Sequence, residues 1–337
     1  MKRRAWLLAI VATGAWAAPA RQQRELMHTT VTVVIADPLA EPALTQAFEE
    51  VFAVFAGIEK TMNEWEPDSA LGRINASAGG KPVASPAPLC EVIRLSLDGA
   101  KRTAGLFDPT WAALKSVWRF GDTDEPRVPS AEAVKKGCAL VGYGDVELKP
   151  GEDPRDGSCQ VRLRRAGMKL GLGGVVKGWG VDQAVGRLRA RGLKNFFIQA
   201  GGDLYFGGKN GARAWRAGIR DPRGPPDQIF AMMEITDRAF STSGDYEHFF
   251  VVDDVRYHHI IDLRTCWPAS ASRSVTVLAR SATDAEFLTK SAFILGGDKG
   301  LALVESLGAA AVIVDSGGKL HVSKSIEGQL ERSPQAP

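Results

Sequence analysis

Residues 281–297, SATDAEFLTKSAFILGG, have the pattern of a helix that packs into a protein core. Leu288, Ala292 and Leu295 recur at positions i, i+4 and i+7, which lie on one face of an α-helix. We therefore expect this helix to dock its apolar face against other elements of a globular core.

The same segment carries polar side chains close to its N-terminus. Asp284, Glu286 and Thr289 bring three oxygen-bearing groups there, and Lys290 follows Glu286 by one helical turn. Two interpretations fit this pattern. The oxygen atoms form one wall of a metal site, or Glu286 and Lys290 form a solvated ion pair in the favourable i, i+4 order.

The first 17 residues have the pattern of a secretory signal peptide. Three basic residues precede a short apolar run, which ends in the small-x-small sequence Ala15-Trp16-Ala17 before Ala18. The run is too short for a membrane span. We expect export to the periplasm by the Sec route or, through Arg3-Arg4, the twin-arginine route. No cysteine near the cleavage site indicates a lipid anchor.

The composition limits the classes of function. The 337-residue chain is 45% hydrophobic and 24% charged, which is typical of a globular protein. Removing residues 1–17 lowers the formal net charge from +3 to 0, so the mature chain lacks the basic field of a nucleic-acid-binding protein. We expect no nucleic-acid partner and no membrane span after cleavage.

Four cysteines permit disulfides in an exported protein. Cys90, Cys138, Cys159 and Cys266 allow three pairings, and the sequence does not choose among them. Their spacing matches no zinc motif.

Strand-like and helix-like segments are mixed without strict βαβ alternation, which predicts an α+β fold. Besides the opening segment, helices are expected at 44–62, 88–104, 130–137, 176–191 and 299–307. Strands are expected at 29–37, within the stretch 159–174, and at 195–208 as one strand. Residues 66–80 are expected to form a polar turn. One domain should cover residues 18–330, followed by a disordered tail at 331–337.

Two glycine-rich stretches are candidate ligand-binding loops. GLGGVVKGWG, residues 171–180, lies between a strand-rich stretch and a helix, where backbone N–H groups and Lys177 are placed to meet a phosphate. In QAGGDLYFGG, residues 199–208, Asp203 is a candidate hydrogen-bonding group. The alternatives are a tight packing turn for the first stretch and a hairpin end or bulge for the second.

Histidines gather in residues 241–268. His258 and His259 are adjacent in a predicted strand and should point to opposite faces, so at most one should enter a given site. This favours one catalytic base over a histidine metal centre that includes His248. Earlier in the chain, the sequence FDPTW at residues 107–111 indicates a turn formed by Asp108.

Eight segments, taken in order, resemble the ApbE family of FAD:protein FMN transferases. They are MHTTVTV, MNEWEPDSALGRIN, FDPT, LGGVVKGWGVD, GGDL, TSGDYE, HHIIDLRT and LTKSAFILG, and they extend over nearly all of residues 27–297. The resemblance implies a mixed α+β, T-fold-related architecture of two intertwined lobes, with FAD in a cleft between them.

The resemblance also implies a reaction. A threonine hydroxyl of a target protein attacks the FMN-side phosphorus of FAD, AMP leaves, and FMN stays attached through a phosphoester bond. A divalent cation, usually Mg²⁺, holds the pyrophosphate in this family. The implied partner is an exported subunit of an electron-transfer complex that carries the acceptor threonine.

Site residues follow by position in the matching segments. The residues that the resemblance places against FAD are Met27, Trp65, Leu106, Phe107, Asp108, Gly171, Lys177 and Ile260. It places the Gly174 carbonyl, Glu286 and Thr289 at the metal. His259 is the candidate base for the threonine hydroxyl, a role that suits a histidine with a pKa near its ordinary value.

Several positions depart from the family pattern. Gly171 stands where an aspartate is usual, Glu286 replaces the metal-binding aspartate, and Lys290 replaces the hydroxyl residue four positions later. These departures keep two alternatives open: an FAD pyrophosphatase that uses water as the acceptor, and a non-catalytic FAD-binding protein.

Overall fold

The computed structural model describes residues 18–121, 125–153 and 155–333. The predicted signal peptide, residues 1–17, lies outside the described residues. Across the described ranges, every helix is too short or too polar to cross a membrane.

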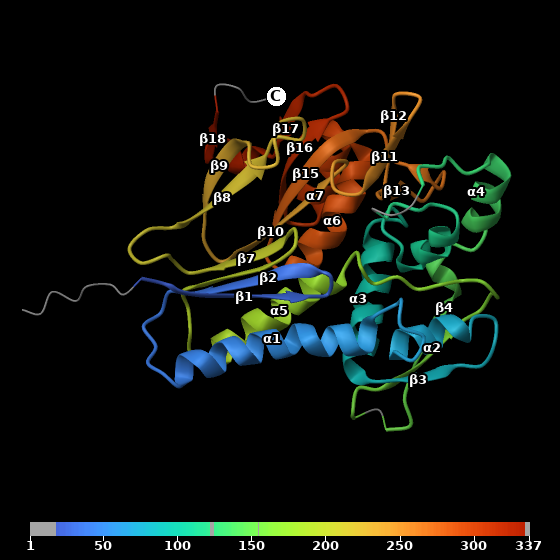
Figure 1. Ribbon diagram of the computed structural model, residues 1–337, viewed down its shortest axis with the longest axis horizontal. Helices are drawn as coiled ribbons and strands as arrows, with labels where there is room; N and C mark the ends of the chain where they lie inside the picture. Colours follow the sequence, from blue (N-terminus) through green and yellow to red (C-terminus); the bar gives the residue numbers. More distant parts are fainter. Residues whose placement is uncertain (1–17, 122–124, 154, 334–337) are drawn as a thin grey trace, which may run out of the picture.

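An eight-stranded antiparallel sheet forms the centre of the molecule (Figure 1). Val31, Val33 and Ile35 of one strand are buried in the main core, whereas Val34 contacts a second core on the other face. This alternation is the consequence of side chains pointing to opposite faces of a strand. In sheet order the strands are β1 (Ala20–Leu26), β2 (Thr29–Ile35), β6 (Phe196–Ala200), β7 (Asp203–Gly207), β10 (Arg238–Gly244), β15 (Ser272–Ala279), β16 (Ala310–Asp315) and β17 (Leu320–Val322).

Several helices contribute to the main core. Those packed nearest the large sheet are α1 (Ala43–Met62), α5 (Val176–Ala190), α6 (Ala282–Leu295) and α7 (Gly297–Ser306). The helix α5 packs against both α1 and α6, and α6 lies on β10 and β15. This arrangement brings the start of α5 next to the start of α6.

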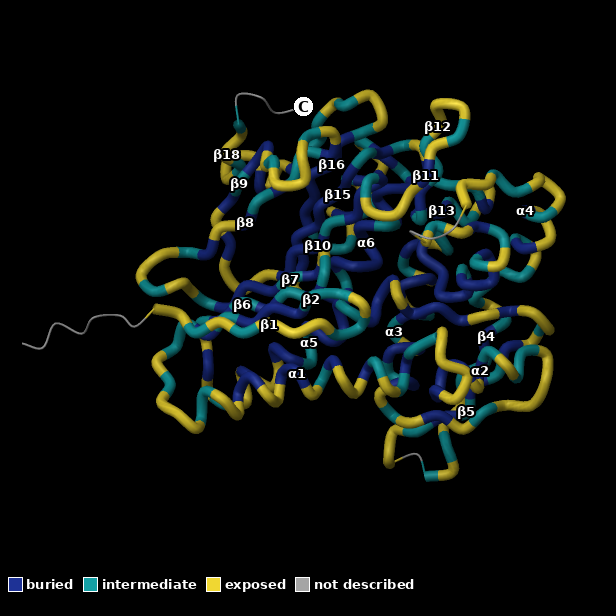
Figure 2. The backbone as a smooth tube through the Cα atoms, viewed as in Figure 1, coloured by how far each residue is buried: buried dark blue, intermediate teal, exposed yellow. Residues whose placement is uncertain are grey.

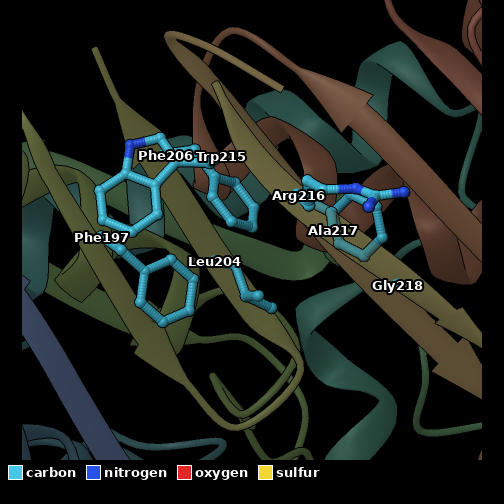
Figure 3. A pocket seen from close by; sticks show the side chains of 8 residues that line it. Phe197, Leu204, Phe206, Trp215, Arg216, Ala217 and Gly218 are labelled. Carbon is cyan, nitrogen blue, oxygen red and sulfur yellow. The ribbon is translucent and has the colours of Figure 1, made fainter. Parts of the chain in front are cut away.

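A three-stranded sheet forms the second core with the other face of the large sheet. Its strands are β18 (Leu330–Arg332), β9 (Ile229–Ile235) and β8 (Trp215–Arg220), and α8 (Lys324–Glu327) precedes β18. Trp215 and Phe206 border a cavity of about 240 Å³ here (Figure 3).

The remaining elements pack largely among themselves. They are α2 (Ala70–Ala76), β3 (Val83–Ser85), α3 (Ala87–Arg102), the 3₁₀ helix η1 (Pro109–Ser116), α4 (Ala131–Cys138), η2 (Tyr143–Asp145), β4 (Val146–Pro150), β5 (Cys159–Leu163), and the hairpins β11 (Phe249–Val252) with β12 (Val255–His258) and β13 (Ile261–Asp262) with β14 (Trp267–Pro268). Of these, α2 packs against α1, and α3 and α4 pack against η1. Figure 2 shows buried backbone running through the interior and exposed residues in the outer loops.

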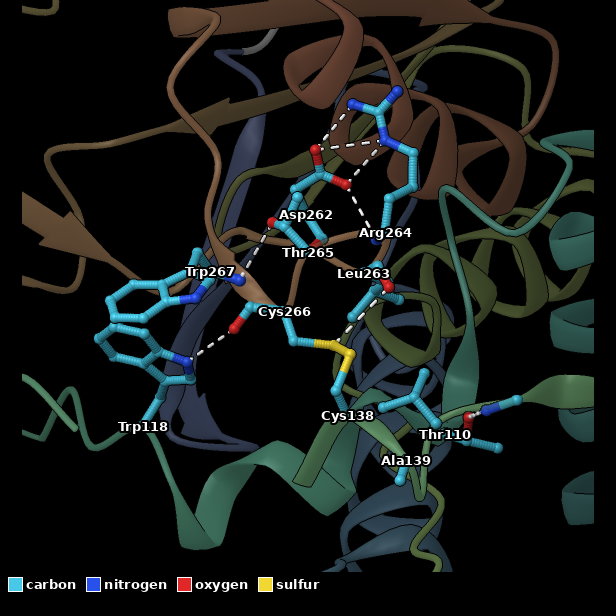
Figure 4. Close-up of a disulfide and its surroundings, with 12 residues drawn as sticks. Thr110, Trp118, Cys138, Ala139, Asp262, Leu263, Arg264, Thr265, Cys266 and Trp267 are labelled. Atoms are coloured by element: carbon cyan, nitrogen blue, oxygen red, sulfur yellow. Dashed lines mark hydrogen bonds and ion pairs between the residues drawn. A yellow bond between two sulfur atoms is a disulfide. The ribbon is translucent and has the colours of Figure 1, made fainter. Parts of the chain in front are cut away.

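Two disulfides resolve the three possible pairings. Cys90 pairs with Cys159, which joins α3 to β5, and Cys138 pairs with Cys266, which joins α4 to the turn between β13 and β14. The indole Nε1 of Trp118 donates to the Cys266 carbonyl at 2.9 Å (Figure 4). This second disulfide therefore anchors the segment that follows His259.

The predicted α+β class is confirmed, and so are the five predicted helices, with shifts of a few residues at their ends. The strand predicted at 195–208 is wrong: it is two strands, β6 and β7, joined by a tight turn in which Gly201 has φ +59°. Glycine adopts this backbone angle without strain, so Gly201 permits the tight turn between the two strands.

Three further expectations need correction. The expected turn at 66–80 contains α2, because the Ser69 hydroxyl accepts from the Gly72 N–H and caps a helix. Residues 164–174, expected to be rich in strand, form turns after β5. The tail expected to be disordered from 331 includes Arg332 of β18, which pairs with β9; residues 334–337 lie outside the described residues.

Candidate functional site

The helix α6 is buried on nearly every side rather than on one face. The Ser281 hydroxyl accepts from the Asp284 N–H at 3.1 Å, and the Asp182 carboxylate accepts from the N–H groups of Ala282 and Thr283 at 2.7 and 2.9 Å. Hydroxyl and carboxylate oxygens satisfy the free N–H groups of a first helical turn. These caps fix where α6 begins, and thus where Glu286 lies.

Glu286 is the centre of the candidate site. Its carboxylate is fully buried, with Oε1 3.1 Å from the Lys177 ammonium and Oε2 accepting from the Gly178 N–H at 2.8 Å. The Lys290 ammonium lies 3.6 Å from the same Oε1. Glu286 and Lys290 therefore do form an i, i+4 pair, but the predicted solvated ion pair is wrong because the carboxylate is inaccessible to water.

The close approach of α5 and α6 requires a glycine at 178. A Cβ at Gly178 would lie 2.5 Å from the Ala282 carbonyl oxygen, inside contact distance. Only a residue without a side chain lets the first turn of α5 reach the Glu286 carboxylate. The favourable charge of a carboxylate near a helix N-terminus adds to this contact.

Asp203, at the start of β7, is the second buried carboxylate. It accepts from the Ser241 hydroxyl at 2.6 Å and lies 3.8 Å from the Lys177 ammonium. Burial and the nearby Glu286 charge raise the pKa of Asp203 to about 6, although Lys177 opposes the shift.

The two lysines respond differently to this environment. Burial would lower the pKa of the Lys177 ammonium, but Glu286 and Asp203 outweigh that effect and hold its pKa above the ordinary value. Burial lowers the pKa of Lys290, and the opposing charges of Glu286 and Asp203 do not fully compensate. Lys290 also donates to the Glu286 carbonyl at 3.0 Å, and Lys177 to the Gly173 carbonyl at 3.0 Å.

The predicted metal ligands lie close to these lysines. A Cβ at Gly174 would lie 3.3 Å from Cε of Lys290, so the glycine backbone contacts the lysine stem. Thr289 is fully buried, and its hydroxyl donates to the Glu286 carbonyl at 2.8 Å and accepts from the Ser243 hydroxyl at 2.9 Å. Asp284 turns away from the site and pairs with Arg102 at 2.7 Å.

This donor set does not fit Mg²⁺. A magnesium ion requires oxygen ligands in near-octahedral geometry, whereas the Glu286 carboxylate is occupied by two ammonium groups and an N–H group. Among the described residues, no group of three or more His, Cys, Asp or Glu side chains is arranged to hold a metal ion. Magnesium binding at Gly174, Glu286 and Thr289 stays a prediction from the resemblance.

His259 follows directly after β12 and is half-buried. Its Nδ1 lies 3.3 Å from the His248 carbonyl oxygen, and its ring centroid is 5.4 Å from that of His248. Burial lowers the pKa of His259 to about 3, and the His248, His258 and Lys290 charges add to the effect. The expectation of a pKa near the ordinary value is therefore wrong, because sequence alone does not show desolvation.

His258 has a structural role. It is buried against Phe293, its Nε2 lies 2.7 Å from the Ala269 carbonyl oxygen, and its Nδ1 accepts from the Ile260 N–H. The two adjacent histidines contact different partners, in line with the prediction that their side chains point to opposite faces. The Ile260 carbonyl accepts from the Ala269 N–H, so Ile260 is fixed within the same loop.

Asp108 and Phe107 position the start of η1. The Asp108 carboxylate accepts from the Thr110 N–H and hydroxyl at 2.8 and 2.6 Å, and from the Tyr143 N–H at 2.8 Å. These bonds confirm Asp108 as a turn former, and burial raises its pKa. Phe107 packs on Phe287 of α6 with ring centroids 5.8 Å apart. Its ring edge also lies near Gly174.

An indole pair encloses a lysine beside Gly171. The Lys115 ammonium lies 4.1 Å from the Trp65 ring centroid and 4.7 Å from that of Trp111, and pairs with Glu64 at 2.6 Å. Trp65 itself is 68% exposed. A Cβ at Gly171 would lie 2.9 Å from a Glu64 oxygen, so the Glu64 carboxylate occupies the space beside this glycine.

Met27 sits at the tip of the β1–β2 hairpin, where it has φ +55° and its N–H donates to Glu59 at 3.1 Å. A Cβ at Gly201 would meet both Thr29 Oγ1 and the stem of Lys177, so the tip of this hairpin lies beside Lys177. Leu106 is half-buried next to Phe107. The structure thus gathers Lys177, Gly174, Glu286, Thr289 and Phe107, and it places Gly171, Trp65 and Asp108 around η1.

Sequence reasoning missed several residues that complete the site. Ser241, Ser243, Glu64 and Lys115 each contact a predicted site residue, and Asp182 caps the helix that carries Glu286. The two serines could have been found from the TSGDYE segment, because Ser243 lies within it and Ser241 immediately precedes it. Lys115 lies in a segment that no motif marked.

Residues 27–314 match the ApbE family. The chain belongs to the ApbE family. It is 33% identical over 291 residues to a FAD:protein FMN transferase of Treponema pallidum, covering 83% of this chain and 80% of that protein. The matched range contains all eight segments on which the resemblance is based.

Solved structures agree with this assignment to the ApbE family. The crystal structure of the ApbE protein of Thermotoga maritima has a TM-score of 0.82 at 31% identity, covering 94% of this chain and all of that one. The apo form of the Pseudomonas stutzeri flavinyl transferase ApbE has a TM-score of 0.79 at 27% identity, covering 92% and 96%. The mixed α+β fold is therefore that of ApbE proteins, while the FAD cleft and the T-fold relation stay predictions.

Proposed function

We propose that this chain is an FAD:protein FMN transferase, which moves FMN from FAD to a threonine of a target protein. Membership of the ApbE family and the name of its Treponema relative support the activity. The structural observation that carries the proposal is the pair Lys177 and Lys290 beside the glycine loop at the start of α5. Ammonium groups and a helix N-terminus are suited to a pyrophosphate.

The bond changes are those of phosphoryl transfer. The threonine Oγ bonds to the FMN-side phosphorus, the bond from that phosphorus to the bridging oxygen breaks, and the bridging oxygen leaves with AMP. Positioning and neutralisation of phosphate charge dominate such reactions. In this chain Lys177 and Lys290 supply positive charge, and the Gly173–Gly174 backbone allows close approach.

We assign the acceptance of the threonine proton to His259. Its Nδ1 faces the His248 carbonyl, which only accepts hydrogen bonds, so Nδ1 carries the proton and Nε2 keeps its lone pair. Burial lowers the pKa of His259, so its ring is neutral and Nε2 is free to accept a proton, but the same shift weakens the ring as a base. The assignment therefore rests on the geometry of His259 and on its place in the matching HHIIDLRT segment.

Magnesium is implied by the family resemblance alone. When bound in an ApbE protein, a divalent cation supplies positive charge to the pyrophosphate. The donor set around Glu286 does not fit that ion, and no step above depends on it.

We also propose that the protein works outside the cytoplasm, on an exported electron-transfer subunit. The predicted signal peptide supports this location, and so do the two disulfides, which form in oxidising compartments. FAD and the acceptor protein are the partners in this proposal.

The test is incubation of the purified protein with FAD and a threonine-bearing acceptor domain. We expect the acceptor to gain the mass of FMN less one water, with one AMP released per modification. An acceptor variant with alanine in place of the threonine is the control. Release of FMN and AMP in solution, with no change in acceptor mass, would instead identify an FAD pyrophosphatase.

A further inference from the structure

We infer that the ammonium groups of Lys177 and Lys290 replace a divalent cation at the FAD pyrophosphate, so that this chain binds FAD without metal. The inference rests on the proposed function, because it assigns how the same site holds its substrate. It begins from the charges that surround Glu286.

The first observation is that both lysines already occupy the carboxylate that would hold a metal. The Lys177 and Lys290 ammonium groups lie 3.1 and 3.6 Å from Oε1 of Glu286, and the Gly178 N–H takes Oε2. A dication bound by Glu286 would lie beside two positive charges. Like charges at such distances repel strongly in a buried setting.

The second observation is the orientation of the charges. The carboxylate side chains of Glu286 and Asp203 are 1% and 4% exposed, whereas Lys177 and Lys290 keep 25% and 27% of their side-chain surface accessible. The two carboxylates are thus inside the protein, and the lysine side chains that pair with them remain partly accessible. An anion at the site therefore has access to the lysines and not to the carboxylates.

The third observation is that Lys290 is held in place. Its ammonium donates to the Glu286 carbonyl at 3.0 Å, and its stem contacts the Gly174 backbone. A lysine fixed at both ends loses little further side-chain entropy when it binds an anion. Lys290 therefore acts as a preorganised cation next to the glycine loop.

The experiment measures FAD binding by the full-length mature protein in three conditions: untreated, with excess EDTA, and with excess Mg²⁺. Isothermal titration calorimetry gives Kd in each condition. We expect the three Kd values to agree within about twofold. A separate titration of Mg²⁺ alone into the metal-free protein should show no binding.

Two variants test the lysine directly. Lys290→Met keeps the aliphatic stem and removes the charge, so it should weaken FAD binding about tenfold or more, as expected for a lost charged hydrogen bond. Lys290→Thr restores the hydroxyl residue of the family pattern and should make FAD binding stronger with Mg²⁺ than with EDTA. Lys209→Met, at an exposed position outside the site, is the matched control and should bind FAD like the parent.

Melting temperatures of all variants show whether they fold. If Lys290→Met destabilises the protein, the EDTA comparison on the parent protein still decides the question. An FAD Kd that improves about tenfold or more on addition of Mg²⁺ would overturn this inference and leave the proposed function intact. No FAD binding in any condition would overturn both.

Discussion

Replacing Glu286 by glutamine keeps the size of the side chain and removes the charge that holds two lysines. The fully buried carboxylate accepts from Gly178 and lies within 4 Å of both ammonium groups. Loss of one partner from a fully buried ion pair costs about 3–5 kcal/mol. Because Lys177 and Lys290 are 25% and 27% exposed, water compensates in part, and we expect a loss of about 2–3 kcal/mol.

The measurement is urea denaturation followed by tryptophan fluorescence and by circular dichroism. For a chain of this length, the expected loss corresponds to a melting temperature lower by roughly 3–5 °C. The double variant with Lys290→Met should lose less than the sum of the two single changes, because the remaining charge imbalance is smaller. The chain offers a matched control in Glu132 and Lys136, an exposed i, i+4 pair 2.8 Å apart.

Glu132→Gln should change the free energy of unfolding by no more than about 0.5 kcal/mol, since exposed pairs contribute little. If Glu286→Gln were as mild as this control, the carboxylate would not be holding the lysines, and the description of the site would be wrong. If it were mild but the double variant were severely unstable, Lys290 would depend on a partner other than Glu286.

Three further predictions concern the base, pH and the second disulfide. His259→Asn should lower the rate of FMN transfer by at least about a hundredfold while FAD Kd changes little, as measured by acceptor mass and calorimetry; equal losses in both would make His259 a binding residue. The folded pKa of Asp203 is raised to about 6, so the folded chain binds more protons than the unfolded chain between the ordinary aspartate pKa and that value. The stability of the parent relative to Asp203→Asn should therefore fall as pH rises from about 4 to about 6. The lowered pKa of His259 makes stability rise with pH in the same range, in both the parent and Asp203→Asn. The quantity to measure is therefore the difference in unfolding free energy between these two proteins at each pH. A difference that does not change with pH would refute the raised pKa of Asp203. Removal of Cys138 and Cys266 as a serine pair should cost about 2–5 kcal/mol and weaken FAD binding, with removal of the other disulfide as the control for stability alone.

Local patterns in the sequence predicted elements whose periodicity is strong. The helix α1 followed from apolar residues at helical spacing, and β2 from its β-branched run. Residues 195–208 were assigned to one strand, with a hairpin end at the glycines only as the alternative, because the sequence does not show that Gly201 takes the positive φ of a tight turn. The helix α2 was missed because its seven residues are too few to show a period.

The ordered motifs also predicted the family and most of the residues at the site. Lys177, Gly174, Glu286 and Phe107 lie together as the motifs implied. Glu64 and Lys115 were not predicted, because their contacts join segments whose meeting depends on how η1 packs beside the glycine loop.

The sequence by itself determined that this is an α+β protein of the ApbE family with a glycine loop, a lysine and a polar helix start. The tertiary structure alone decided the pairing of the cysteines and the state of each charge. Glu286, Lys290 and His259 illustrate the reason: a residue letter specifies which group can ionise, whereas burial and neighbouring charges set its pKa and its partners. For Glu286 those include a contact across 109 residues of sequence, with Lys177, which local sequence patterns do not show.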